Sequence, residues 1–188
     1  MKTFITSVLA IGVLVAGSGV AFIYSGLYPV GADNHHTAPV HWALETLRKR
    51  SIAAQSADIK VPPLDDPQML LSGGADYNDM CAGCHLKPGK TRSDMSLGLY
   101  PMPLNLTAPA VATDVGNNNA ENRERAAARQ FWVIKHGIKA SGMPAWGITH
   151  DDPRIWAMVA FVQRLPTLTP AQYQILTARE PADARMMH

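Results

Sequence analysis

The stretch Cys81-Ala82-Gly83-Cys84-His85 decides how this chain of 188 residues is interpreted, because it holds both of the chain's cysteines. Two cysteines three positions apart exclude a disulfide-rich secreted scaffold, so the pair has to be interpreted as local chemistry. A thioredoxin-like redox pair belongs in a strand–helix–strand setting, of which the sequence gives no sign, and a zinc site needs further cysteines or paired histidines. A structural disulfide would leave His85 without a role.

The same five residues match C-x-x-C-H, the pattern by which c-type haem is attached to protein. One helical turn presents two thiols to the two vinyl groups of one porphyrin edge, and the adjacent imidazole can bind the iron. The sequence therefore predicts one haem c, attached through Cys81 and Cys84, with His85 as an axial ligand. The cofactor also explains how a domain of about 100 residues with few aromatic side chains can be stable, because a tightly bound ligand stabilises the folded state.

The second axial ligand is predicted in the constrained apolar loop of residues 142–147, where Met143 follows a glycine and precedes a proline. A thioether ligand favours reduced iron and so raises the reduction potential. Met102, which lies between two prolines, is the main competitor, and His136 would instead give two histidine ligands. The sequence favours Met143 and leaves the other two open.

The rest of the chain is typical of helices and loops, with no convincing strand alternation. Helical patterns surround the cysteine pair at about residues 67–80, 122–136 and 152–166. Asp152 is the expected N-cap of the last helix, with Pro153 at its first position, and Gly137 ends the middle one where helices often turn left-handed. Residues 86–121 show no period, so this long loop is expected to wrap around the cofactor.

The N-terminal stretch of residues 4–23 is apolar or small throughout, and no charged residue occurs from 3 to 32. About 20 such residues, at about 1.5 Å rise each, span a hydrocarbon core of roughly 30 Å. A cleaved signal peptide is the alternative, because Gly19 and Ala21 are small residues at a possible processing site. The apolar stretch is longer than the about 7–15 residues of a usual signal core, however, so an uncleaved anchor is predicted.

Four segments are therefore predicted: a membrane anchor at 1–28, a juxtamembrane helix and proline-rich linker at 29–66, a haem domain at 67–170, and a C-terminal tail at 171–188. The juxtamembrane helix is expected to start near Pro39, and the prolines of the linker block helix and sheet pairing. His35, His36 and His41 have no carboxylate or cysteine spaced to complete a metal site, so they are expected to be solvated.

The overall charge is balanced, with 17 Lys and Arg against 15 Asp and Glu and a formal net charge of +2. This balance and 47% hydrophobic residues describe an ordinary folded chain and exclude an electrostatic nucleic-acid binder. Basic residues nevertheless follow the haem motif or precede the Met143 loop: Lys87, Lys90, Arg92, Arg129, Lys135 and Lys139. If they gather at the haem edge they would steer an acidic partner, and the alternative is that they are scattered and solvated.

Residues 67–166 resemble the single-haem class I cytochrome c domain, as found in the subunit III type of cbb3 oxidases and in related membrane-anchored bacterial cytochromes. The residues that carry the resemblance are Tyr77, the CAGCH stretch, Pro88-Gly89, Leu104-Asn105-Leu106, residues 131–138, residues 142–146 and residues 156–166. The resemblance implies an all-α class I cytochrome c domain wrapped around one covalent haem and preceded by a single transmembrane helix.

The same resemblance implies that the first and last helices of the domain cross near the haem edge, with Gly73 or Gly74 against Trp156 or Phe161. The chain departs from the family pattern at Leu86, because such proteins often carry glycine directly after the histidine of the motif. This departure is expected to alter loop geometry and to leave iron ligation unchanged.

The implied function is one-electron transfer in a bacterial respiratory chain, and not enzymatic catalysis. Such proteins carry haem on the outer face of the inner membrane, so a single-pass chain with its haem domain in the periplasm is expected. The expected partners are redox proteins: a terminal oxidase, or a membrane or periplasmic dehydrogenase or reductase. His150 and Asp151 are expected to cap a helix and not to form an acid–base pair.

Two other functions stay open. The first is a haem enzyme or gas sensor with a labile distal ligand. The second is a fixed electron-relay subunit of a terminal oxidase or a membrane dehydrogenase, in which a tether keeps the haem near its partner.

Overall fold

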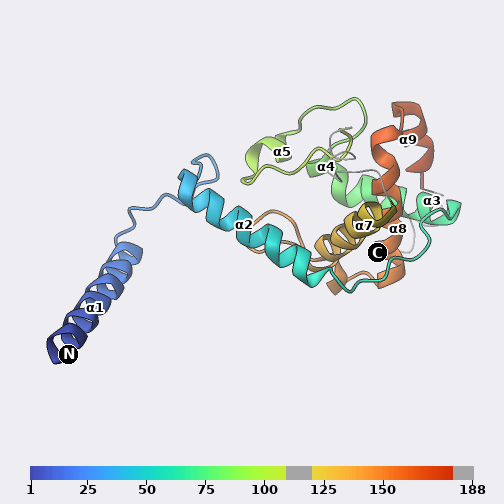
Figure 1. Cartoon of the computed structure of the whole chain (residues 1–188). Coiled ribbons are helices and arrows are strands. Elements are labelled where there is room, and N and C mark those ends of the chain that lie inside the picture. Colours follow the sequence, from blue (N-terminus) through green and yellow to red (C-terminus); the bar gives the residue numbers. More distant parts are fainter. Residues whose placement is uncertain (109–119, 180–188) are drawn as a thin grey trace. The chain divides into compact units, whose positions relative to one another are not determined.

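The computed structural model describes residues 1–108 and 120–179, and within these ranges it contains helices and no strand. Contacts divide the chain into two compact units, residues 1–35 and 36–188. The first unit holds helix α1, Lys2–Tyr24, and the second holds the other labelled helices (Figure 1). The all-α class predicted from the sequence is confirmed.

Helix α1 is long and apolar enough to cross a membrane, by its length and composition. None of its 23 residues is buried, which distinguishes it from the core helix of a soluble domain. A signal sequence near the N-terminus would meet the same criterion of length and composition. The helix is therefore compatible with a single-pass anchor.

The second unit contains ten helical elements among the described residues. They are α2 (Ala38–Gln55), α3 (Pro67–Asp76), the π-helix η1 (Tyr77–Cys81), α4 (Ala82–His85), α5 (Asp94–Gly98), α7 (Ala120–His136), the 3₁₀ turn η2 (Trp146–Ile148), α8 (Asp152–Arg164), the 3₁₀ turn η3 (Leu165–Thr167) and α9 (Pro170–Leu176). Helix α5 falls in the stretch expected to be a loop. It forms because Ser93 and Ser96 make a reciprocal capping box around its first turn.

The predicted N-cap of α8 is wrong by one residue. Asp151 has the extended backbone of a cap, and its carboxylate accepts a hydrogen bond from the backbone N–H of Arg154 at 3.0 Å. Asp152 is already helical, so Pro153 occupies the second helical position. The error arises because two aspartates precede the proline and either can cap. The expectation that Asp151 serves as a capping group is confirmed.

The crossing of α3 and α8 depends on two glycines. A Cβ atom on Gly73 would overlap the carbonyl oxygen of Ala157 in α8, and a Cβ on Gly74 would overlap the carbonyl oxygen of Leu176 in α9 and lie 2.9 Å from Cε2 of Phe161. The predicted crossing at these glycines is confirmed, although Gly73 meets the backbone of Ala157 and not the side chain of Trp156. Backbone therefore packs directly on backbone at this point.

Two clusters of buried side chains form the core of the domain. The Tyr77 cluster contains Tyr77, Ala82, Phe161, Val162, Leu165 and Tyr173. The Phe131 cluster contains Ala127, Phe131, Ile134, Ile155, Met158 and Val159. Helix α8 contributes to both clusters, so it is the central element of the domain (Figure 1).

Residues on both sides of the haem domain proper pack onto it. Ile59, Val61 and Leu64 of the proline-rich segment pack against the Phe131 cluster, so this segment lies along the domain. Tyr173 of α9 is 4% exposed and lies within the Tyr77 cluster, although the segment from 171 onward was expected to be a tail. A helix of seven residues with one buried aromatic has too little periodicity to be recognised in the sequence. Residues 180–188 of that expected tail lie outside the described residues.

The histidines before and within α2 are not all solvated as expected. The ring of His36 makes an edge contact with Tyr100 at 5.2 Å between centroids, and Nδ1 of His41 lies 3.4 Å from the Tyr100 hydroxyl. The start of α2 therefore contacts the loop that follows α5. Sequence spacing alone could not show this contact, because 59 positions separate His41 from Tyr100.

A buried carboxylate joins α3 to α8 and to the segment after α9. Asp76 is 3% exposed, and its two oxygens accept hydrogen bonds from Arg154 at 2.6 and 2.8 Å and from Arg179 at 3.0 Å. Arg179 also pairs with Asp79 at 2.7 Å. Burial by itself would raise the pKa of Asp76, but the hydrogen bonds and charges of the two arginines outweigh it and hold this pKa below its usual value.

Replacing Asp76 with Asn is expected to lower the free energy of unfolding at pH 7 by about 2 kcal/mol, because Arg154 loses its charged partner and Arg179 keeps only Asp79. The pKa of the Asp76 carboxyl is lower in the folded state than in the unfolded state, where it is about 4. The ionised carboxylate therefore stabilises the fold at a pH above the unfolded-state pKa. This stabilisation is lost as the pH falls through the folded-state pKa. The difference between wild type and Asp76→Asn should therefore shrink in urea titrations at pH 3. Asp58→Asn at an exposed position is the control, and equal stabilities of Asp76→Asn and wild type at pH 7 would contradict the expectation.

Candidate functional site

The two cysteines lie one helical turn apart where η1 continues into α4. Both are half-buried, and neither forms a disulfide. Burial, assisted by the charge of Asp76, raises the pKa of the Cys81 thiol to about 12. A thiol that stays protonated at neutral pH differs from the activated thiolate of a redox-exchange pair. The raised pKa therefore argues against a thioredoxin-like centre, and the spacing of one helical turn is compatible with two attachment points for haem.

The imidazole of His85 is oriented through one ring nitrogen. Its Nδ1 lies 2.8 Å from the carbonyl oxygen of Leu104. A neutral imidazole that donates the Nδ1 proton to this carbonyl leaves the Nε2 lone pair available for a metal, which is the usual arrangement of a ligating histidine. Burial lowers the pKa of His85, and the hydrogen bond to Leu104 opposes this effect only in part. The neutral form that can bind iron is therefore favoured.

The backbone around His85 is held by Tyr77. The buried Tyr77 hydroxyl lies 2.8 Å from the carbonyl oxygen of Leu86, to which it donates, and 3.2 Å from that of His85. Leu86 has a φ of 74°, in the left-handed region that favours glycine. Its side chain is buried, so packing and the Tyr77 hydrogen bond hold a backbone that glycine would adopt freely. Leu86 therefore adopts a backbone conformation that a glycine at this position would favour.

The Met143 loop lies against the C-terminal end of α7 because Gly137 permits it. Gly137 has a φ of 64°, and a Cβ there would lie 2.7 Å from the carbonyl oxygen of Met143. That oxygen accepts a hydrogen bond from Ile138 N–H at 3.1 Å, and the N–H of Met143 donates to Oγ of Ser141 at 3.1 Å. The predicted left-handed glycine is confirmed, and the backbone of Met143 is fixed on both of its polar groups.

The three candidate second ligands differ in their surroundings. Met143 is half-buried and packs against the Phe131 cluster. Met102 is 65% exposed and belongs to neither cluster in the described part of the chain. His136 is exposed and stacks obliquely on Trp132, with ring centroids 5.0 Å apart. Met143 is thus the candidate whose position the fold determines most fully.

The segment that contains Leu104, the hydrogen-bond partner of His85, exposes large apolar side chains. Met95, Leu97 and Leu104 are each more than half exposed, and Leu104 is the residue whose carbonyl faces His85. A large, flat, apolar group bound beside His85 would cover such side chains, as burial of apolar surface favours. The residues present therefore fit a haem. Residues 109–119 of the expected wrapping loop lie outside the described residues.

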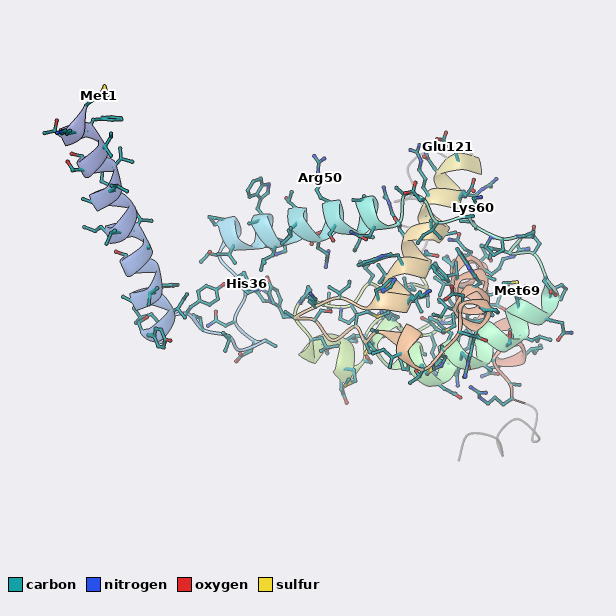
Figure 2. The ribbon with its side chains drawn as sticks, turned by 90° about the horizontal axis from the view of Figure 1, so that it is seen from below. Met1, His36, Arg50, Lys60, Met69 and Glu121 are labelled. Atoms are coloured by element: carbon teal, nitrogen blue, oxygen red, sulfur yellow. The ribbon has the colours of Figure 1, made fainter. Side chains whose placement is uncertain are left out.

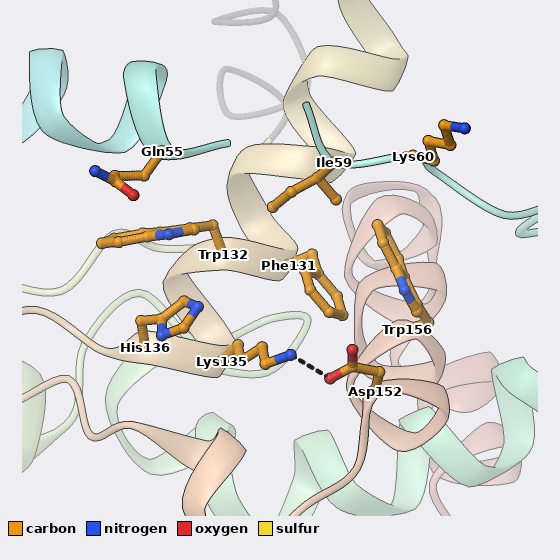
Figure 3. A pocket seen from close by; sticks show the side chains of 9 residues that line it. All are labelled: Gln55, Ile59, Lys60, Phe131, Trp132, Lys135, His136, Asp152 and Trp156. Carbon is orange, nitrogen blue, oxygen red and sulfur yellow. Dashed lines mark hydrogen bonds and ion pairs between the residues drawn. The ribbon is translucent and has the colours of Figure 1, made fainter. Parts of the chain in front are cut away.

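A groove of about 430 Å³ lies elsewhere, where the end of α2 meets α7 and the start of α8 (Figure 3). The ring of Phe131 stacks on Trp156 in this groove at 4.1 Å between centroids, and Lys135 forms an ion pair with Asp152 at 2.6 Å. None of the four predicted site residues lines it. Its ion pair also shows that Lys135, one of the basic residues expected near the haem edge, already has an acidic partner.

Sequence reasoning missed three groups that position the site: the carbonyl of Leu104, the hydroxyl of Tyr77 and the hydroxyl of Ser141. Leu104 and Tyr77 were noted only as points of resemblance. A backbone carbonyl is present at every position, so no residue type could have indicated the role of Leu104.

Comparison with known proteins places these features in a family. The family model described as cytochrome C oxidase, cbb3-type, subunit III matches residues 68–162, which is half of the chain. No curated protein and no solved structure matches. The matched segment includes the C-x-x-C-H stretch, the Met143 loop and most of the α3–α8 pair. Domains of this family bind covalent haem c and transfer electrons through its iron. The chain belongs to the cbb3-type cytochrome c oxidase subunit III family, with haem c as its cofactor.

Proposed function

We propose that Cys81 and Cys84 carry the haem, that His85 and Met143 bind its iron, and that the domain passes single electrons between respiratory proteins in the periplasm. The observation that carries this proposal is the contact between Nδ1 of His85 and the carbonyl of Leu104, which orients the imidazole as a metal ligand. The bound haem supplies an iron that alternates between ferric and ferrous states.

The remaining chemistry is done by the chain's own residues. The Leu104 carbonyl holds the proton of His85 on Nδ1, and Ser141 and Gly137 fix the backbone of Met143. A thioether ligand that is held firmly in place would keep the reduction potential of the iron high. It would also leave no free coordination position on the iron for a substrate. This arrangement favours electron transfer over a haem enzyme or gas sensor.

Replacing Met143 with Ala in the haem-bound full chain tests the ligand set. The wild type is expected to be low-spin and indifferent to carbon monoxide. Met143→Ala is expected to bind carbon monoxide and to lose potential on the order of 0.1 V, within the about 0.8 V over which axial ligands set it. Absorption spectra and a redox titration measure both effects.

Met102→Ala is the matched control, because it removes a thioether from an exposed loop. It is expected to leave the spectrum and the potential unchanged. If Met102→Ala gives the change and Met143→Ala does not, Met102 is the ligand. A wild type that already binds carbon monoxide strongly would instead support the enzyme or sensor function.

The apolar helix α1 and the family support a location at the membrane. We propose that α1 stays uncleaved as a single-pass anchor in the inner membrane, with the haem domain on the periplasmic side. The family supports association with a terminal oxidase, and a membrane or periplasmic dehydrogenase or reductase is the other class of partner. Stable co-purification with an oxidase would identify a fixed relay subunit, and its absence a tethered carrier.

The proposed docking surface for an acidic partner depends on the basic residues that remain available. Lys90, Arg92, Arg129 and Lys139 are exposed, whereas Lys87 donates to Oδ1 of Asn78 at 2.8 Å and Lys135 pairs with Asp152. An ion pair reduces the charge that a distant partner experiences. Lys139 is therefore expected to contribute more to steering than Lys135.

A further inference from the structure

We propose that the N-terminal half of α2, residues 38–47, inserts into the membrane–water interface and holds the haem domain close to the lipid surface. The inference rests on the proposed function in one respect, the uncleaved anchor α1. It assigns a membrane-contacting role to a part of the periplasmic unit itself.

The two halves of α2 have different surroundings. Toward its C-terminal end, Ile52 and Ala53 are half-buried, Ser56 directly after the helix is 4% exposed, and Ile59 packs against the Phe131 cluster. This half is fixed to the domain. The N-terminal half touches the domain through His41, whose Nδ1 lies 3.4 Å from the Tyr100 hydroxyl, but its large apolar side chains stay exposed and are available for another contact.

The N-terminal half exposes large apolar side chains. Trp42, Leu44 and Leu47 are 69%, 48% and 67% exposed. Leu44 and Leu47 are three residues apart and share one side of the helix, whereas Trp42 lies on another side. A partner helix or a second copy of this chain would cover a single stripe, but a lipid interface surrounds an inserted helix end on several sides. Tryptophan in particular is enriched at such interfaces.

The charged residues of α2 are concentrated directly after its N-terminal half. The only charged residue among residues 38–47 is Glu45, and it pairs with Arg48 and with Lys49, whose Nζ lies 3.1 Å away. Arg50 completes a run of three basic residues and points away from the body of the domain (Figure 2). The apolar end of the helix would lie at the boundary of the acyl chains, and the basic cluster that follows it would lie among the anionic headgroups.

Chain connectivity keeps this segment within reach of the membrane. Thirteen residues, 25–37, connect the end of α1 to the start of α2. Even fully extended, they span at most about 45 Å at about 3.5 Å per residue. The anchor therefore holds α2 at a high effective concentration near the lipid, and a small apolar surface is sufficient for binding.

The test places a nitroxide label on the haem-bound full chain in vesicles of neutral and anionic phospholipid. Both native cysteines are expected in thioether bonds, so a single introduced cysteine can be labelled. Leu47→Cys probes the proposed contact, and Ala54→Cys is the matched control, because position 54 is exposed two turns later on the same side of α2. We expect the ratio of collisions with oxygen to collisions with a water-soluble nickel chelate to be several-fold higher at 47 than at 54.

Each other outcome overturns the inference in a distinguishable way. Equal, water-like ratios at both positions would show that α2 does not contact lipid while the anchor holds. A label at 47 that is immobilised and shielded from both reagents would show a protein in this place. A chain that an alkaline wash removes from the vesicles would refute the anchor, and with it the basis of this proposal.

Discussion

A chain in which both Cys81 and Cys84 are replaced with Ala is expected to carry no covalent haem at all. The two thiols are the only groups in the sequence that can form thioether bonds, since the chain has no other cysteine. Haem that survives denaturing electrophoresis, detected by its peroxidase stain, should be present in wild type and absent from the double variant. A residual stain in the double variant would contradict the assignment of the attachment points.

The same double variant is expected to lose stability, because a tightly bound ligand favours the folded state over the unfolded one. Met95, Leu97 and Leu104 would stay in contact with water, and the segment would be held at the motif only by polar contacts such as that of His85 with the Leu104 carbonyl. Lys90→Ala is a suitable control, since it changes an exposed residue of the same segment and should keep both the haem and the stability of wild type.

Gly73→Ala is expected to lower the free energy of unfolding of the haem-bound chain by about 3 kcal/mol, at the upper end of overpacking effects. The added Cβ would overlap the backbone carbonyl of Ala157, and no rotamer change can relieve a contact with backbone. The α3–α8 pair would have to separate, which would loosen both the Tyr77 cluster and the Phe131 cluster. Chemical denaturation followed by circular dichroism measures the effect.

Gly98→Ala is the matched control for this prediction. Gly98 ends helix α5, and nothing lies within 4 Å of where its Cβ would be. Its replacement is expected to change the free energy of unfolding by less than about 1 kcal/mol, the range of intrinsic helix propensity. Similar effects of both variants would show that the Gly73 crossing is not as tight as the structure indicates.

Features that depend on residue type or on local spacing could be predicted from the sequence. The C-x-x-C-H stretch predicted the haem, which the family match supports, and Gly137 predicted the left-handed end of α7. The paired glycines of α3 indicated a close backbone approach, which is observed at α8. Each of these signals rests on a property that only one or two residue types possess.

Features that depend on long-range packing or on the backbone could not be predicted. The carbonyl of Leu104 reaches His85 across 19 positions, and Tyr100 contacts His41 across 59. Nothing in the composition of α9 distinguishes a tail from a helix whose Tyr173 enters the Tyr77 cluster. These contacts depend on the tertiary arrangement, so no local sequence pattern indicated them.

The packing of residues 59–64 on the Phe131 cluster limits how far the haem can travel. A proline-rich stretch without contacts would act as a long flexible tether and let the domain move far from its point of attachment. Here the flexible tether is limited to residues 25–37, because α2 belongs to the same compact unit as the domain. If α1 is the membrane anchor that we propose, encounters with a redox partner occur by lateral diffusion within a thin layer, and membrane-bound partners would meet this haem far more often than freely dissolved ones.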